Sequence, residues 1–146
     1  MATLNAIKTL SDLSTRQSED AAKRLGQANH ARDKNEQQFN LLVEYRESYA
    51  NQLQLQLSQG LTVTDYSNFQ QFMTALDQAI AQQNRIVQTS LQFVEKERSH
   101  WQLCERKRLS FDTLTQRAQQ DLIDKEKSQD QKQTDERASR RYSSQK

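Results

Sequence analysis

The sequence contains no proline, only two glycines and a single cysteine in 146 residues. Disordered segments are usually rich in proline, whereas long helices exclude it because its ring removes a backbone donor and clashes with the preceding turn. Hydrophobic residues make up only 34% of the chain and charged residues 27%, which leaves too little apolar material for a compact core. These features favour long helices that bury narrow apolar stripes.

The same composition disfavours several classes of protein. The one cysteine, Cys104, excludes an internal disulfide and fits a reducing compartment. The stretch from Met1 to Asn5 lacks the apolar core of a signal peptide, and no apolar run reaches the length of a membrane span. The net charge is +2 with acids and bases interleaved, whereas nucleic-acid binders concentrate basic residues in a patch. We therefore expect a soluble, cytoplasmic chain that binds no nucleic acid.

One strong break, Ser58-Gln59-Gly60, divides the chain. Gly60 suits the left-handed position just beyond a helix, where a side chain would cost energy. Thr62 or Thr64 can cap the next helix, and Asp65 is favourable in its first turn. Because a short turn makes two long helices antiparallel neighbours, we expect an all-α fold of two long helices in an antiparallel coiled-coil hairpin.

Four segments follow from this interpretation. Residues 1–58 form the first coiled-coil helix, 59–63 the hairpin turn, and 64–122 the second coiled-coil helix. Residues 123–146 form a polar helical extension or a disordered tail, because the sequence beyond Leu122 is almost free of apolar residues.

Apolar residues recur at alternating spacings of four and three residues, the period of a coiled-coil seam. In the first helix this series is Ala21, Leu25, Ala28, Arg32, Asn35, Phe39, Leu42, Arg46, Tyr49 and Leu53, with Leu4 and Ile7 further back on the same line. In the second helix it is Tyr66, Phe69, Met73, Leu76, Ile80, Gln83, Val87, Ser90, Val94, Glu97, Trp101, Cys104, Arg108 and Phe111, and it continues through Thr115 and Ala118 to Leu122. The polar members are expected to weaken the seam while fixing its register.

Apolar side chains also occupy the flank beside this seam. If the seam residues are heptad positions a and d, position g holds Gln38 and Tyr45 in the first helix and Phe72, Ala79, Ile86 and Phe93 in the second. In an antiparallel pair the two g flanks face each other, so Tyr45 and Phe72 line the same side near the hairpin end. Such positions are usually charged in a simple coiled coil. Either they form a partner surface, or they widen the buried face of the pair.

No group of residues predicts catalysis. His30 and His100 are isolated on polar surfaces, and no glycine-rich phosphate loop is present. His100 and Cys104, four residues apart, are a possible metal half-site, but two ligands do not make a structural zinc centre. The basic run from Arg106 to Arg108 could bind an acidic partner or nucleic acid, although a solvated helix face is its more usual role. We expect no enzyme activity, no cofactor and no metal.

The order and spacing of several motifs match a known family. The motifs are Leu10 to Leu13, Ala21-Ala22, Leu25-Gly26, Leu42 with Tyr45 and Tyr49, Asn68-Phe69-Gln70-Gln71-Phe72, Leu76, Ala79-Ile80, Gln82, Trp101 with the basic run to Leu109, Thr113-Leu114, Arg117, Asp130-Gln131-Lys132 and Asp135-Glu136. On these residues the sequence resembles the FliJ family of flagellar export proteins over essentially its whole length. The resemblance implies a coiled coil similar to the central stalk subunit of rotary ATPases.

The family resemblance also implies partners. It implies that the chain binds the hexameric export ATPase FliI and the export gate protein FlhA, with FliH and export chaperones as further partners. It implies no cofactor. The location implied is cytoplasmic, peripheral at the cytoplasmic face of the inner membrane at the flagellar basal body, so that the membrane is met only through the export apparatus. An analogous stalk protein of a virulence secretion system and a generic coiled-coil scaffold are the alternatives.

Two sets of site residues are expected from the resemblance. The family's gate-binding surface falls on Gln38, Leu42, Tyr45, Tyr49, Phe72, Leu76, Ala79 and Gln83. Gln83 departs from the family pattern, which has a histidine there. By analogy with the rotary stalk, the segment that carries Ile7, Leu10 and Leu13 would contact the ATPase ring.

Overall fold

The computed structural model describes residues 2–144 and contains two helices, α1 over Ala2–Gln59 and α2 over Val63–Ser144. These residues form no strand, and the two long helices pack against each other, so the predicted all-α fold is confirmed. Both helices pass through two compact units. Unit 2 is Ala21–Trp101, and unit 1 combines Met1–Asp20 with Gln102–Lys146.

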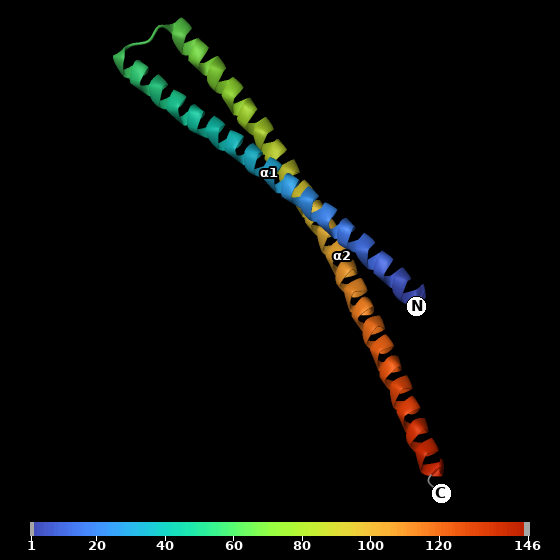
Figure 1. Ribbon diagram of the computed structural model, residues 1–146. Helices are drawn as coiled ribbons and strands as arrows, with labels where there is room; N and C mark the ends of the chain where they lie inside the picture. The colour runs from blue at the N-terminus through green and yellow to red at the C-terminus, as the bar shows by residue number, and fades with distance from the viewer. Residues whose placement is uncertain (1, 145–146) are drawn as a thin grey trace. The chain divides into compact units, whose positions relative to one another are not determined.

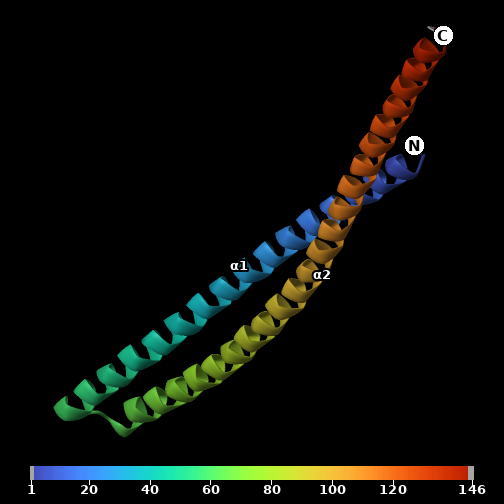
Figure 2. The same cartoon turned by 90° about the horizontal axis from the view of Figure 1, so that it is seen from below.

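The turn that joins the helices lies within unit 2. Gly60 has a φ of +99°, a conformation that residues with a side chain rarely adopt. The Thr62 Oγ1 accepts a hydrogen bond of 3.1 Å from the Asp65 backbone N–H, so Thr62 rather than Thr64 caps α2. Figures 1 and 2 show the consequence, with the green end of α1 turning back into α2 and the two helices running alongside each other through this unit.

The predicted seam is the core of unit 2. Every seam residue of α1 from Ala21 to Leu53 is buried or half-buried, and so is every one of α2 from Phe69 to Trp101. Val94, only 2% exposed, is among the largest fully buried side chains. Of the residues predicted for the seam of this unit, Tyr66 at the hairpin end is the exception, because it is exposed.

Polar seam residues bond across the helix pair. The Asn35 Nδ2 donates to the Ser90 Oγ over 2.6 Å, and the Gln83 Nε2 donates to the Asn35 backbone carbonyl over 3.0 Å. Arg46 directs its guanidinium to the carboxylate of Asp77 on α2. Its hydrogen bonds to that carboxylate hold the pKa of Asp77 below its ordinary value. These contacts join α1 and α2 in one register within unit 2.

Unit 1 has a seam of small polar residues on the α1 side. Ser14 and Ser18 are only 2% and 4% exposed, in line with the half-buried Leu4 and Ile7. The Ser18 Oγ donates to Glu105 of α2 over 2.5 Å. The Arg108 Nε also donates to Glu105, over 3.1 and 3.2 Å. The bonds from Arg108 and then from Ser18 lower the pKa of Glu105 to about 2.

Beyond this seam α2 has no neighbouring helix. Residues 123–144 are helical and every one of them is exposed. Figure 2 shows this red part of α2 extending past the N-terminal end of α1 within unit 1. A polar helix exposed on all sides obtains little stability from packing and depends on its own backbone bonds and local side-chain pairs.

Candidate partner-binding site

Four aromatic rings meet near the hairpin end of unit 2. Tyr49 lies at the centre, with its ring centroid 4.9 Å from that of Phe69 and 4.5 Å from that of Phe72. Tyr45 stacks on Tyr49 at 6.4 Å and meets Phe72 edge to face at 6.2 Å. These spacings are those of favourable aromatic pairs. We call Tyr45, Tyr49, Phe69 and Phe72 the aromatic cluster.

The cluster is anchored on one side and open on the other. Tyr49 and Phe69 occupy seam positions and are half-buried, whereas Tyr45 is 54% and Phe72 38% exposed. Ile86 and Phe93 further along the g flank are exposed as well. The described chain therefore leaves much of this flank uncovered, which favours a partner surface over a merely widened internal face.

All eight residues of the expected gate-binding surface lie in unit 2. Leu42, Tyr49 and Leu76 belong to the seam and support the flank from beneath, while Gln38, Tyr45 and Phe72 are exposed and Ala79 is half-buried. Gln83 is half-buried, and its amide bonds to the Asn35 carbonyl of α1. At this position the side chain thus contributes to holding the two helices together.

Leu41 is an exposed residue that the heptad pattern did not single out. It is 63% exposed and lies four residues before Tyr45, so that both side chains share one face of α1. Leu41 is neither a seam nor a g position, so the signals that add it to the surface are its spacing of four residues from Tyr45 and its exposure.

The flank opposite the cluster is polar. Its heptad e positions include Glu36, Asp77, Asn84 and Arg98, and Asp77 forms the ion pair with Arg46 there. Val43 and, at the hairpin end, Leu57 are exposed apolar residues on this side, and Leu91 is half-buried there. The exposed rings of Tyr45, Phe72 and Phe93 all lie on the g flank, so a partner that buries them would approach from that side.

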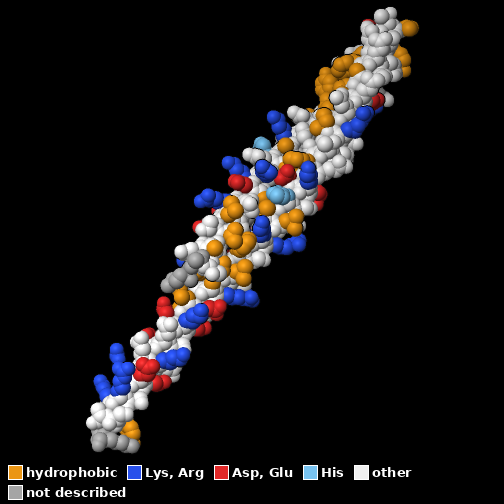
Figure 3. Space-filling model, turned by 90° about the vertical axis from the view of Figure 1, so that its right-hand side faces the viewer, with side chains coloured by type: hydrophobic (Ala, Val, Ile, Leu, Met, Phe, Trp, Pro, Cys, Tyr) orange, Lys and Arg blue, Asp and Glu red, His pale blue; other side chains and the backbone are white. Residues whose placement is uncertain are grey.

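The hairpin end carries few charges. Between Glu47 and Arg85 the only charged residues are Asp65 and Asp77, and Asp77 is paired with Arg46. Figure 3 shows orange side chains gathered in its upper part, over the hairpin end, with few charged side chains among them. A partner can cover such a surface without desolvating many charges, which lowers the cost of docking.

The expected ring-contact residues lie in unit 1. Ile7 is half-buried in the seam, whereas Leu10 and Leu13 are exposed. A shallow depression of about 310 Å³ lies nearby, lined by Thr3, Leu4, Ala118, Asp121, Leu122 and Lys125. Unit 1 thus has exposed leucines of its own, without an aromatic cluster among its described residues.

Residues 2–144 hold no group of three histidine, cysteine or acidic side chains placed to bind a metal ion. The pair His100 and Cys104 therefore gains no third ligand of these types within that range. Neither helix contains a stretch that is both long and apolar enough to cross a membrane, over the same range.

The fold and the site define a two-helix coiled-coil protein with an exposed aromatic flank. The family model described as Flagellar FliJ protein matches residues 4–146. The chain is 32% identical to the Flagellar FliJ protein of Escherichia coli (strain K12), covering 96% of this chain and 95% of the relative. It is 29% identical to that of Salmonella typhi over the same shares. The chain belongs to the FliJ family, and the predicted resemblance is confirmed.

Proposed function

We propose that this chain is a non-enzymatic component of the flagellar type III export apparatus that couples the export ATPase ring to the export gate. It also assists the delivery of chaperones and substrates for flagellum assembly. Family membership supports the flagellar setting. The observation that supports the mechanism is the aromatic cluster, in which the exposed Tyr45 and Phe72 lie against the half-buried Tyr49.

The aromatic cluster has the properties of a binding anchor. Aromatic side chains are enriched among the residues that dominate binding energy, because they bury much area with little loss of rotamer freedom. Here Tyr49 holds both exposed rings in place, being stacked on Tyr45 and packed against Phe72. A surface ordered in this way pays little conformational entropy on docking. We assign this surface to the gate protein FlhA.

Unit 1 supplies the second contact. Leu10 and Leu13 are exposed there, and Ile7 lies in the seam beside them. We assign this segment, with the facing part of α2, to the ATPase ring of FliI, with FliH and export chaperones as further partners. The location that follows is the cytoplasmic face of the inner membrane at the basal body, with the membrane met only through the apparatus.

Calorimetric titration with the purified cytoplasmic domain of FlhA tests the gate contact. Replacing both Tyr45 and Phe72 with alanine should weaken binding by at least about tenfold, since truncated anchors cost more than about 1 kcal/mol each. The control is Val43→Ala on the polar flank, which should leave affinity and helix content unchanged. Equal affinity of the double variant and the wild type would remove the aromatic cluster from the gate contact.

A generic scaffold that dimerises through its g flank is the second candidate, and the observation that favours it is the exposure of Ile86 and Phe93. Sedimentation separates the two. A scaffold gives a dimer whose population rises with concentration, whereas an export component with a separate partner sediments as a monomer. The flagellar names of the relatives weigh against the analogous stalk of a virulence secretion system.

A further inference from the structure

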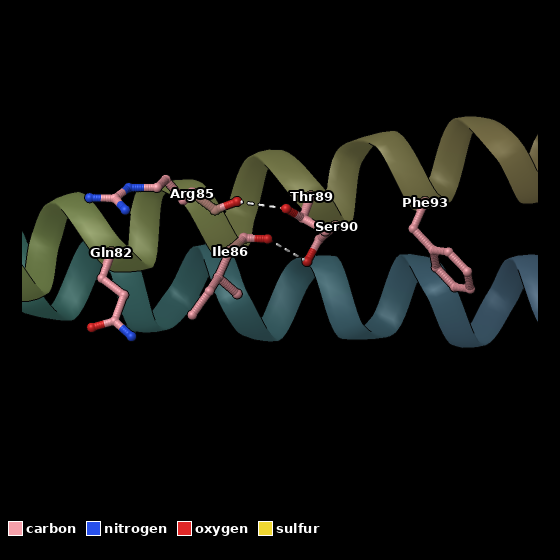
Figure 4. A pocket seen from close by; sticks show the side chains of 6 residues that line it. All are labelled: Gln82, Arg85, Ile86, Thr89, Ser90 and Phe93. Atoms are coloured by element: carbon pink, nitrogen blue, oxygen red, sulfur yellow. Dashed lines mark hydrogen bonds between the residues drawn. The ribbon is translucent and has the colours of Figure 1, made fainter.

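The g flank of unit 2 continues beyond the residues assigned to the gate. Ile86 and Phe93 are 41% and 50% exposed and lie seven residues, or about 10.5 Å, apart along α2. Figure 4 shows both side chains projecting from the same side of the helix, with Ser90 between them. Neither residue belongs to the seam. The seam residues next to them in the sequence are Val87 and Val94, which are buried.

Two depressions follow this flank and share Phe93. The first, of about 420 Å³, is lined by Gln82, Arg85, Ile86, Thr89, Ser90 and Phe93. The second, of about 350 Å³, is lined by Arg24, Gln27, Ala28, Ala31, Phe93 and Glu97. The small side chains of Ala28 and Ala31 on α1 line the second depression together with Phe93, and they leave space beside the ring. We call the two depressions together the Phe93 groove.

In the first depression the hydroxyl of Ser90 already has hydrogen-bond partners. The Ser90 Oγ donates to the Ile86 carbonyl over 3.0 Å and accepts a bond of 2.6 Å from the Asn35 amide of α1. A ligand therefore need not supply a hydrogen bond to Ser90. Ile86 and Phe93 form the apolar lining of the groove, and this lining favours the binding of apolar side chains.

The charged residues that line the groove are Arg85 and Glu97 on α2 and Arg24 on α1. Arg85 is the only charged residue between positions 78 and 94. Among the described residues Arg85 makes no ion pair, and neither does Arg24 at the other end, where Glu97 lines the same depression. A carboxylate beside Arg85 would thus complement the groove without displacing an existing partner.

We propose that the Phe93 groove binds an amphipathic helix of a partner protein, with apolar residues at heptad spacing and a carboxylate against Arg85. From Gln82 to Glu97 the groove follows α2 for roughly 22 Å, the length of about 15 helical residues. Ile86 and Phe93 are seven residues apart, which is one heptad. A partner helix with apolar residues at heptad spacing could therefore pack against both, as a third helix of the coiled coil. The proposal goes beyond gate docking and does not depend on it.

The probe is a synthetic 18-residue amphipathic helix with leucine at the a and d positions and glutamate on both flanks. Its twin carries lysine in place of every glutamate. Fluorescence anisotropy with the full chain should show the acidic peptide binding more tightly than its twin. Ile86→Ala with Phe93→Ala should weaken the acidic peptide at least about tenfold, whereas Val43→Ala should have no effect.

Arg85→Glu is the second variant, and it cannot be confused with unfolding because Arg85 is exposed. It should weaken the acidic peptide and strengthen the lysine twin. Equal binding of the two peptides by wild type and by all variants overturns the proposal. So does a concentration-dependent dimer of the wild type that Phe93→Ala abolishes, since the occupant would then be a second copy. The Tyr45 and Phe72 double variant should bind the acidic peptide normally, which separates this site from the gate contact.

Discussion

The rings of Tyr45 and Phe72 meet edge to face across the two helices, with centroids 6.2 Å apart, although 27 positions separate them in the sequence. Both rings also contact Tyr49, which belongs to the seam. The exposed flank is therefore built on the same register that holds the fold together. A shift of that register would separate Tyr45 from Phe72 and destroy the surface.

Val94 and Phe93 are neighbours with opposite expected roles. Val94 is 2% exposed in the seam, so Val94→Ala should lower the free energy of unfolding by about 2 kcal/mol through lost burial and a residual cavity. Phe93 is exposed, and Phe93→Ala should cost clearly less. Urea unfolding followed by circular dichroism measures both. A larger loss for Phe93→Ala would mean that Phe93 belongs to the core.

The two glycines should respond to alanine with opposite signs. Gly60 has a φ of +99°, so Gly60→Ala should destabilise the chain by about 1–2 kcal/mol through backbone strain. Gly26 lies inside α1 with nothing within 4 Å of an added Cβ, so Gly26→Ala should stabilise it by about 0.5–1 kcal/mol. The midpoints of thermal unfolding should move down and up respectively. Equal shifts in one direction would contradict the turn geometry.

Glu105 should make stability depend on pH in the acid range. Its pKa is lowered from an ordinary value of 4.5 to about 2 by Arg108 and Ser18. Because the folded state holds the charged form more strongly, the stabilisation is complete above about pH 4.5 and is lost as the pH falls toward 2. The difference in unfolding free energy between wild type and Glu105→Gln should be constant near neutral pH and shrink in that window. A difference independent of pH would exclude the contact.

Much of the fold was predictable from the sequence, for reasons visible at particular residues. The glycine at position 60 and the four-three spacing of Leu42, Arg46, Tyr49 and Leu53 depend only on local geometry and periodicity. The same geometry predicted that Tyr45 and Phe72 line one side. The buried Ser14 and Ser18 were not predicted, because small hydroxyl residues give no apolar signal although they pack well where helices lie close.

The rest of the candidate site needed coordinates. Leu41 lies outside the seam and the g flank; its spacing from Tyr45 is visible in the sequence, but its exposure is not. The Phe93 groove depends on the alanines of α1 that lie opposite Phe93, a match between distant segments that no local pattern contains. The bond from Gln83 to the Asn35 carbonyl likewise depends on the final register.

Photo-crosslinking in motile cells tests the central claim most directly, which is that the aromatic cluster docks on the export gate. The photoreactive residue p-benzoylphenylalanine is placed at position 45 in one strain and at position 43, on the polar flank, in another. Irradiation should link the chain to FlhA from position 45 and not from position 43, with both proteins expressed equally. Crosslinking to FlhA from position 43 alone, or with equal yield from both positions, would contradict the account.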